Sequence, residues 1–278
     1  MNLRKIAIIG MGLMGGSLAA AAKRHFPNAF LTGVSRNRAA LGLARKKMWV
    51  HETTTNLAKG VAGADLIVVC TPVDCLSRML KLIDPSAKDG ALVTDVGSVK
   101  QTILRRISGR KWKHIRFVSA HPMVGSHERG MESATPWLYD QGYTFLIRPE
   151  PKDAGAYAAV KGFWKKISPR VIEMSAREHD KLVGEISHLP HLLAVCLVLG
   201  TQKKFLKFAA AGYRDVTRVA EGHPSIWFPI FQANRKEILN SLARFEQQIR
   251  AFRKAYGASH SRKLVRLLEE ARRKRQEI

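Results

Sequence analysis

The feature that most constrains the fold of this chain is a glycine-rich turn directly after its first apolar run. The run 6–9 ends in Gly10-Met-Gly12-Leu-Met-Gly15, and a helical stretch, 17–25, follows at once. A strand, glycines at this spacing and a helix together form the dinucleotide-binding fingerprint. Gly10 allows the tight turn, Gly12 lets the backbone approach a pyrophosphate, and Gly15 lets helix and strand pack closely. Because a helix N-terminus attracts anions, the pattern predicts a nucleotide-binding fold.

The start of the chain also has features of a secretory leader, because Arg4 and Lys5 precede an apolar stretch that reaches Ala22. Three glycines at fingerprint spacing inside that stretch favour mature structure instead. The three cysteines give neither a disulfide framework nor a metal-binding spacing. No apolar run reaches the length of a membrane span, and the longest, 192–199, is expected to be a core helix segment. We therefore expect a cytoplasmic protein.

The charge of the chain is unusual. Its 278 residues carry 47 basic and 22 acidic side chains, a net charge of +25, and 46% of the residues are hydrophobic. A large excess of basic over acidic residues can indicate nucleic-acid binding. Here the basic residues are spread over the whole length, without an interleaved aromatic platform or a recognised nucleic-acid module. We therefore expect a basic surface that aids solubility and attracts small anions, without nucleic-acid or membrane partners.

Residues 1–175 alternate short apolar runs with helical patterns, which predicts a Rossmann-type, doubly wound and mostly parallel sheet. The expected strands are 6–9, 30–34, 66–70, 92–95 and 116–119, with weaker patterns at 144–147 and 171–174. Helical patterns between them include 38–47 and 100–107. We therefore expect residues 1–175 to form a dinucleotide-binding α/β domain.

The pattern changes after Ser175, beyond which no strand is expected. The expected features are a helix over 179–199 kinked at Pro190, a break at Gly212, a helix from Pro224 towards Arg253, and a basic helix over 261–277. A single copy of this helical half cannot easily bury all of its apolar helix faces. We therefore expect residues 176–278 to form an all-α substrate and dimerisation domain, with the chain assembling as a homodimer.

The end of the second expected strand discriminates between the two nicotinamide dinucleotides. A carboxylate there would bond the ribose 2′-hydroxyl and select NAD. Here Ser35 takes that position, followed by Arg36, Asn37 and Arg38. A small hydroxyl with one or two arginines suits a 2′-phosphate, although these arginines could also simply begin a helix in solvent. We expect NADP as the cofactor, with NAD as the alternative.

Two polar clusters follow expected strands, at the sheet edge where such folds bind ligands. In 95–100, Asp-Val-Gly-Ser-Val-Lys, Ser98 could bond substrate or nicotinamide, cap the helix that begins near Lys100, or do both. In 121–126, His-Pro-Met-Val-Gly-Ser, His121 could accept the proton of an alcohol being oxidised, or be structural. The place of His121 at this edge favours the catalytic role.

A third cluster, Gly-Tyr-Arg-Asp-Val-Thr-Arg at 212–218, lies in the expected helical half. Its two arginines, Arg214 and Arg218, are four residues apart and can share a helix face. Either could bind a carboxylate of a ligand, and either could instead form a structural ion pair with Asp180 or Asp215.

Two histidines, His188 and His191, are three residues apart in the expected long helix. Such a pair can bind a metal ion, but no glutamate completes the metalloprotease pattern. We therefore expect no metal site.

Taken together, these segments resemble the prephenate/arogenate dehydrogenase family of tyrosine biosynthesis. The segments run in family order to about Asn234: 10–17 (GMGLMGGS), 69–73 (VCTPV), 95–100 (DVGSVK), 121–125 (HPMVG), 179–180 (HD), 187–191 (SHLPH) and 212–218 (GYRDVTR). The glycine pattern alone is common, whereas the combination with the three histidine- and arginine-containing motifs is specific. Because no regulatory or chorismate mutase extension is visible, the chain is similar to the short monofunctional form.

The resemblance implies an oxidative decarboxylation, in which hydride leaves the hydroxyl-bearing ring carbon for the nicotinamide, carbon dioxide departs and the ring becomes aromatic. It implies that His121 accepts the hydrogen bond of the ring hydroxyl, and that Ser98 contacts this hydroxyl and helps to fix His121. Arg218 would bind the ring carboxylate, with Asp180 orienting Arg218 or its neighbours. His188 would lie near the substrate's side-chain end. Further implied substrate contacts are Arg214, Ser126 and Trp227, and implied cofactor contacts are Gly10, Gly12, Leu13, Met14, Gly15, Ser35, Arg36, Arg38, Thr71 and Pro72.

Two positions depart from the family pattern. Members that use NAD carry an acidic residue where Ser35 stands, and His127 occupies a position that is acidic in some relatives. No residue distinguishes prephenate from arogenate, which has an amino group in place of the keto oxygen. Two other functions stay open: a β-hydroxyacid or imine dehydrogenase using a lysine such as Lys181 or Lys203, and a nucleotide-sensing or nucleic-acid-binding protein.

Overall fold

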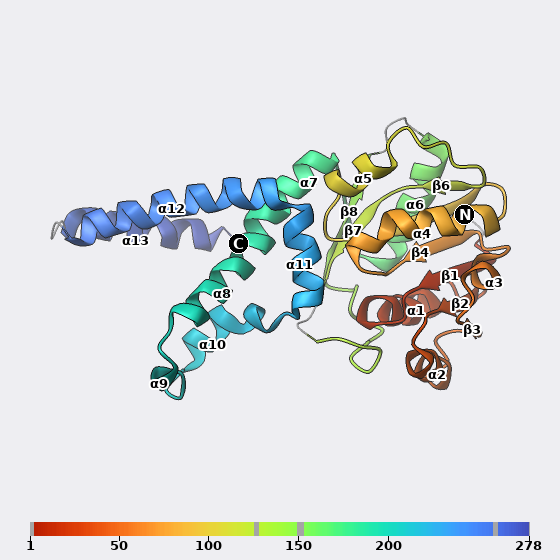
Figure 1. Ribbon diagram of the computed structural model, residues 1–278, viewed down its shortest axis with the longest axis horizontal. Helices are drawn as coiled ribbons and strands as arrows, with labels where there is room; N and C mark the ends of the chain where they lie inside the picture. Colours follow the sequence, from red (N-terminus) through yellow and green to blue (C-terminus); the bar gives the residue numbers. More distant parts are fainter. Residues whose placement is uncertain (1–2, 125–127, 149–152, 258–260, 278) are drawn as a thin grey trace.

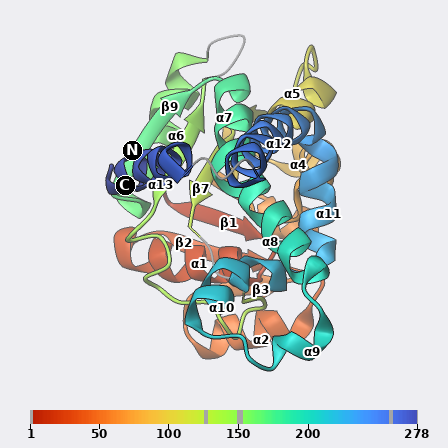
Figure 2. The same ribbon diagram turned by 90° about the vertical axis from the view of Figure 1, so that its left-hand side faces the viewer.

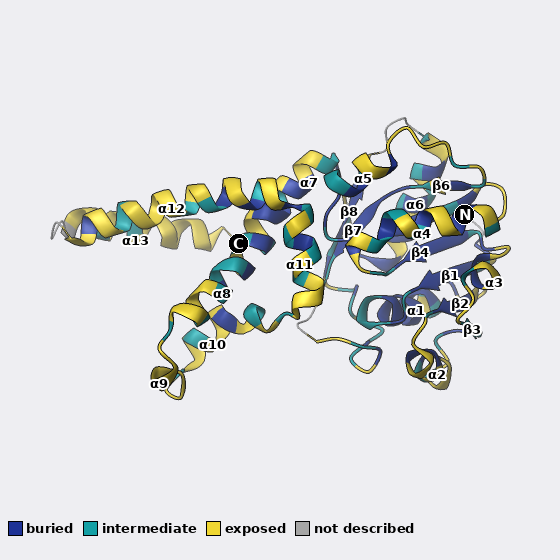
Figure 3. Ribbon diagram, viewed as in Figure 1, coloured by how far each residue is buried: buried dark blue, intermediate teal, exposed yellow. Residues whose placement is uncertain are grey.

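The strand-containing part of the chain comes first, and a group of helices projects from it, as Figure 1 shows. The computed structural model describes residues 3–124, 128–148, 153–257 and 261–277. Most strands are buried, whereas the projecting helices are largely exposed along their length (Figure 3). The fold therefore confirms the predicted architecture of an α/β nucleotide-binding part followed by an all-helical part.

The main sheet has six parallel strands in the order β3-β2-β1-β4-β5-β6. The strands are β1 (Lys5–Ile9), β2 (Phe30–Val34), β3 (Glu52–Thr54), β4 (Leu66–Val69), β5 (Ala91–Asp95) and β6 (Ile115–Phe117). The apolar runs of β1 and β4 are almost wholly buried, as expected at the centre of a sheet that is covered on both faces. The strand order reverses between β1 and β4, and ligands of doubly wound sheets bind at the carboxyl ends of the strands at such a point.

Helices cover both faces of this sheet, and each face has its own apolar core. One core includes α1 (Leu13–His25), α2 (Arg38–Lys46) and α6 (Ala154–Ile167). The other includes α3 (Leu57–Val61), α4 (Leu76–Ile83) and α5 (Gln101–Ile107), with 3-10 turns at Val73–Cys75 and Asp84–Ser86 flanking α4. Asparagine side chains cap α2 and α3, because Oδ1 of Asn37 and of Asn56 accepts a backbone N–H three residues on, at 3.1 and 3.0 Å.

A second, three-stranded sheet lies beside the main one. It contains β7 (Ala120–Met123), β8 (Tyr143–Ile147) and β9 (Arg170–Met174), with β7 antiparallel and β9 parallel to β8. The expectation that the last two strands extend one sheet was wrong, and β3 and β7 were not predicted. A strand of only three polar residues, as in β3, lacks an apolar signal, and Pro122 interrupts the strand pattern of β7.

The second half of the chain is helical, and Figure 2 looks roughly along its last two helices, which are seen nearly end-on. The elements are α7 (Ala176–Val183), a π-helical turn (Gly184–His188), α8 (Leu189–Gly200), α9 (Lys203–Leu206), α10 (Ala211–Thr217), a 3-10 turn (Arg218–Glu221), α11 (Pro224–Ala233), α12 (Arg235–Gly257) and α13 (Ser261–Gln276). The antiparallel hairpin of α12 and α13 extends furthest from the sheets (Figure 1).

Three expectations for this half were wrong in detail. The irregularity of the long helix is the π-helical turn before Pro190, and Pro190 itself lies in the first turn of α8, where its missing N–H has no cost. Gly212 lies inside α10 rather than at a break. The helix from Pro224 ends at Ala233, because Asn234 leaves helical geometry and its side chain bonds to α7.

The continuous helix Ala176–Gly200 is long and apolar enough to cross a membrane by composition alone, with a mean hydropathy of 1.8 over its most apolar window. Four buried polar residues along it, His179, Asp180, His188 and His191, bond to or stack on other parts of the chain. Its last turns are not the core segment that we expected, since Leu197 and Leu199 are 43% and 80% exposed. This helix therefore has one face packed within the chain and one face uncovered.

The glycine turn generates a stability prediction with its own control. A Cβ on Gly15 would lie 1.9 Å from the carbonyl oxygen of Gly10, whereas a Cβ on Gly12 would meet nothing within 4 Å. We expect Gly15→Ala to lower the free energy of unfolding by about 1–3 kcal/mol, the usual cost of overpacking. Gly12→Ala should change it by about 0.5 kcal/mol or less. Urea denaturation measures both, and equal effects of the two substitutions would contradict this account of the turn.

Candidate active site

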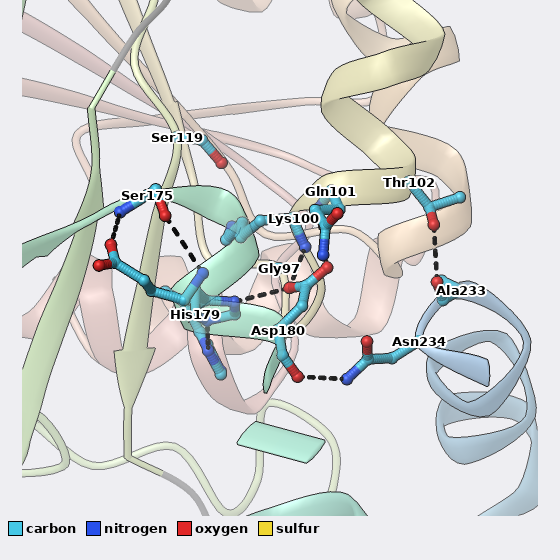
Figure 4. A network of polar contacts seen from close by, with 12 residues as sticks. Gly97, Lys100, Gln101, Thr102, Ser119, Ser175, His179, Asp180, Ala233 and Asn234 are labelled. Atoms are coloured by element: carbon cyan, nitrogen blue, oxygen red, sulfur yellow. Dashed lines mark hydrogen bonds and ion pairs between the residues drawn. The ribbon is translucent and has the colours of Figure 1, made fainter. Parts of the chain in front are cut away.

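The candidate site lies where the carboxyl end of β5 meets β7 and the helical part. Figure 4 shows polar groups from the start of α5, from α7 and from the end of α11 converging beside it. β5 ends at Asp95, β7 carries His121, and α7 carries His179 and Asp180. All four side chains are at most 7% exposed. Buried polar groups need partners, and their hydrogen bonds define the geometry of the site.

Asp95 is the centre of the first group of bonds. Its Oδ2 accepts from the backbone N of Gly97 at 2.9 Å and from Nζ of Lys100 at 2.7 Å. Its Oδ1 accepts from Oγ of Ser119 at 2.7 Å and from the backbone N of Ala120 at 3.1 Å. Burial lowers the pKa of the Lys100 ammonium, and the Asp95 carboxylate opposes that shift. The pair thus ties the segment after β5 to the start of β7.

Asp180 is the centre of the second group. Its Oδ1 accepts from the backbone N of Lys100 and its Oδ2 from that of Gln101, both at 2.8 Å. α5 has no cap from its own segment, so a carboxylate from α7 satisfies its N-terminal amides. Ser98 therefore does not cap this helix. Nδ1 of His179 also lies 2.8 Å from Oδ1 of Asp180.

His121 completes this chain of bonds. Its Nδ1 lies 2.8 Å from Nε2 of His179, with the two rings at 71°. Burial lowers the pKa of His121 well below its ordinary value, and the neighbouring His179, Lys100 and His188 add to the shift. His121 is therefore neutral near pH 7, as a proton acceptor must be.

An aromatic group borders this network on the helical side. The ring of Trp227 stacks on His191 at 3.6 Å between centroids, and its plane is perpendicular to that of His188. Nδ2 of Asn234 donates to the backbone oxygen of Asp180 at 2.8 Å and lies 3.0 Å from Nδ1 of His188. Burial lowers the pKa of His188 to about 4. These contacts join α11, α8 and α7 around His188.

The glycine turn and the end of β2 have features that fit a dinucleotide. Gly10 has φ +95°, which favours glycine, and the space beside Gly12 is open. α1 has neither a side-chain cap nor an acidic residue in its first turn, so its first amides can meet a phosphate. Oγ1 of Thr71, at the end of β4, is enclosed without a hydrogen-bond partner among the described residues.

The end of β2 carries no carboxylate. Oγ of Ser35 accepts from the backbone N of Asn37 at 3.2 Å, while the side chains of Arg36 and Arg38 are exposed. Exposed guanidinium groups beside a hydroxyl suit a phosphate, and Asn37 rather than either arginine caps α2.

The structure separates the predicted substrate contacts into two sets. His121, His188 and Trp227 lie in or beside the buried network, and Ser98 is half-buried at the loop after β5. Arg218 is exposed at the start of the 3-10 turn, and Arg214 is exposed with its Nε donating to the backbone oxygen of Ala209. Ser126 and His127 lie outside the described residues.

Two predicted relationships need correction. Among the described residues no hydrogen bond joins Ser98 to His121, and His179 holds His121 instead. In the part of the chain that the structure describes, the side chain of Asp180 bonds to α5 and to His179 and not to Arg218, so it does not orient Arg218 directly. Sequence reasoning assigned no role to His179, Asp95, Lys100 or Asn234. The signal for the first three was that they lie in 95–100 and 179–180, two of the segments that carry the family resemblance.

Comparisons with known proteins show the family to which this chain belongs. The model of the prephenate dehydrogenase nucleotide-binding domain matches residues 18–173, and that of the prephenate dehydrogenase dimerization domain matches residues 175–270. Prephenate dehydrogenase of Bacillus subtilis is 32% identical over 252 residues, which cover 88% of this chain and 67% of that protein. Cyclohexadienyl dehydrogenase of Zymomonas mobilis is 28% identical over 98% of this chain and 95% of its own length.

Solved structures give the same result. Prephenate dehydrogenase from A. aeolicus, in complex with hydroxyphenyl propionate and NAD⁺, has a TM-score of 0.91 and 27% identity, covering 100% of this chain and 99% of that one. Synechocystis arogenate dehydrogenase has a TM-score of 0.81 and 26% identity, covering 98% of this chain and 99% of that one.

The buried histidines make stability depend on pH. Burial lowers the pKa of His121, His179 and His188 in the folded chain, whereas the unfolded chain binds protons near pH 6.5. Stability is therefore complete above pH 6.5 and is lost as the pH falls towards about 4, the pKa of His188. Each histidine should contribute on the order of 1 kcal/mol per pH unit in this window.

Urea denaturation between pH 7 and pH 5 checks this prediction. We expect the free energy of unfolding to decrease as the pH is lowered. His188→Gln should make this dependence on pH shallower by the contribution of one histidine, on the order of 1 kcal/mol per pH unit. A free energy that is independent of pH in this range would show that these histidines titrate normally in the folded chain.

Proposed function

Because this chain belongs to the prephenate dehydrogenase family, we propose that it catalyses the oxidative decarboxylation of prephenate, arogenate or both in tyrosine biosynthesis. It is an NAD(P)-dependent dehydrogenase with a Rossmann-type nucleotide-binding domain. The observation that carries the proposal is a buried, neutral histidine, His121, held by hydrogen bonds at the edge of that domain. A histidine in this state can accept the proton of a hydroxyl.

The chemistry needs a base at one end of the ring and a cation at the other. The nicotinamide, when bound, accepts the hydride from the hydroxyl-bearing carbon. His121 takes the hydroxyl proton, the carboxylate leaves as carbon dioxide, and the electrons of its bond to the ring complete the aromatic system. Holding these groups around one substrate lowers the entropic cost of the reaction.

For the substrate we propose the following contacts. Ser98 and His121 bind the ring hydroxyl, Arg218 binds the ring carboxylate, and His188 and Trp227 border the side-chain end. The perpendicular contact between His188 and Trp227 supports a shared wall. Exposure of Arg218 on a turn that packs on α8 supports a role in binding an incoming anion. Arg214 and Ser126 are proposed as further contacts.

For the cofactor we propose NADP in preference to NAD. The absence of a carboxylate at the end of β2, with Arg36 and Arg38 exposed beside Ser35, supports this preference. The backbone at Gly10, Gly12 and Gly15 would hold the pyrophosphate. Leu13, Met14, Thr71 and Pro72 are proposed as its other contacts.

We also propose a homodimer through the helical domain, in the cytoplasm. The domain boundary is placed between residues 175 and 176, where Ser175 caps α7. Apolar side chains exposed on the helical part support dimerisation: Leu199, Phe208, Val216, Phe228, Val265 and Leu268. The rival dehydrogenase class finds no support in Lys181 or Lys203, because both side chains are exposed.

Activity assays test the proposed reaction. Purified protein should reduce NADP⁺ when given prephenate or arogenate, with release of carbon dioxide, and comparison of the two rates identifies the preferred substrate. We expect His121→Asn to lower kcat by about 10²- to 10⁴-fold with a modest change in KM, because it removes the base and little binding. A wild-type protein that turns over neither substrate would refute the function, and an unchanged kcat in the variant would remove His121 from it.

Substitution at Ser35 tests the cofactor preference. Ser35→Asp places a negative charge where the 2′-phosphate would lie, so we expect the ratio of kcat/KM for NADP to that for NAD to fall by about tenfold or more. Ser35→Ala is the matched control, since it removes the hydroxyl without adding charge and should change the ratio little. If the aspartate variant keeps the wild-type ratio, the 2′-phosphate does not bind at this position.

A further inference from the structure

We propose that His179 and Asp180 are positioning residues that hold His121 in a single tautomer, with its proton on Nδ1 and with Nε2 unprotonated. The inference rests on the proposed function, because it explains how His121 can act as the base. It assigns a role to the histidine and aspartate of the 179–180 motif that is distinct from substrate binding. The argument follows the hydrogen bonds from Asp180 outwards.

The first bond of the chain has a defined direction. A backbone N–H can only donate, so both oxygens of Asp180 act as acceptors towards Lys100 and Gln101. An aspartate carboxylate has no proton to donate. The third polar contact of this group, 2.8 Å from Nδ1 of His179, must therefore have the histidine as its donor. The proton of His179 thus lies on Nδ1.

The second bond follows from the first. Burial lowers the pKa of His179, so its ring is neutral near pH 7 and carries one proton. With that proton on Nδ1, Nε2 of His179 is an acceptor, and Nδ1 of His121, 2.8 Å away, must donate to it. His121 is also neutral, because its pKa is lowered by burial. Its Nε2 therefore carries a lone pair.

The free nitrogen of His121 is accessible. Enclosed side-chain polar atoms without a partner in the described chain are Oγ1 of Thr32, Thr71 and Thr144 and Nδ1 of His191. Nε2 of His121 is not among them, although no described residue forms a hydrogen bond with it. The rest of the hydrogen-bond network is closed to water, since His179 is 0% and Asp180 1% exposed. Water cannot compete for the bonds that set the tautomer.

The same hydrogen bonds also stabilise His121 after it has accepted the proton. When Nε2 of His121 takes the hydroxyl proton, the O–H bond breaks, an N–H bond forms, and the ring becomes a cation. That cation still donates from Nδ1 to His179, and the negative charge of Asp180 at the far end stabilises it. The other charged or titratable groups around the His121 cation are His188, Lys100 and Asp95. The charges of Lys100 and Asp95 balance each other, because the two residues form an ion pair. Asp180 therefore carries the unbalanced negative charge in the network.

Nitrogen NMR of the protein with isotope-labelled histidine reads the tautomer directly, without substrate. We expect Nδ1 of both His121 and His179 to be protonated and Nε2 of His121 to have the shift of an unprotonated nitrogen. His179→Leu removes the acceptor, so the spectrum should show a mixture of His121 tautomers and kcat should fall by about 10²-fold with little change in KM. The side-chain oxygen of glutamine can accept from Nδ1 of His121, so His179→Gln should have a kcat about tenfold higher than that of His179→Leu.

Two further variants separate positioning from stability. Ser175→Ala weakens the cap of α7 without touching the chain of bonds, so it should lower the melting temperature and leave kcat and the histidine spectrum unchanged. Asp180→Asn removes the charge that supports the cation, so the acidic limb of the pH profile of kcat should move to lower pH.

The outcomes distinguish this inference from the proposed function. A wild-type spectrum with the proton on Nε2 of His121 would overturn the inference even in an active enzyme, as would a His179→Leu variant with wild-type kcat and tautomer. The expected spectrum in a protein that turns over neither substrate would contradict the function and leave the hydrogen-bond chain intact.

Discussion

The carboxylate of Asp180 is the contact on which the geometry of the site depends. It comes from the first helix of the C-terminal half and satisfies the uncapped amides of α5, which lie 80 and 79 positions earlier in the chain. The same group holds His179, and the backbone oxygen of the same residue accepts from Asn234. One residue thus fixes the helical part against the nucleotide-binding part. Removal of this group would leave helix amides and an imidazole without partners, which is far more costly than the loss of one surface bond.

Burial determines the chemistry of the site as much as residue type does. A low-dielectric surrounding strengthens each paired bond and penalises each unpaired charge. Lys100 and Asp95 remain there only as a pair with further hydrogen bonds, and the histidines remain neutral. The many cations of this basic chain lie outside the network, with Lys100 the exception, so the net charge of +25 does not prevent a neutral base at its centre.

The sequence alone predicted the elements whose signal is local. The apolar runs of β1, β2, β4 and β5 and the glycine spacing identified the sheet and its ligand edge, and the position of His121 after a strand pointed to that edge. The strands β3 and β7 were not predicted from the sequence, because β3 is short and polar and β7 contains Pro122. The partners of His121 and of α5 could not be predicted, since these contacts join residues 58 to 80 positions apart and depend on how the two domains pack. The expected core segment 192–199 is only partly buried, because an apolar run does not reveal which surface of the protein covers it.

The π-helical turn at Gly184–His188 sets the rotation of everything that follows it along the helix. Such a turn is equivalent to one extra residue within an otherwise regular helix. Successive residues of a regular helix are rotated by about 100° about its axis. Loss of a single residue here would restore regular winding and swing His188 and His191 away from Asn234 and Trp227. The spacing of residues along this helix is therefore as important to the site as the identity of its histidines.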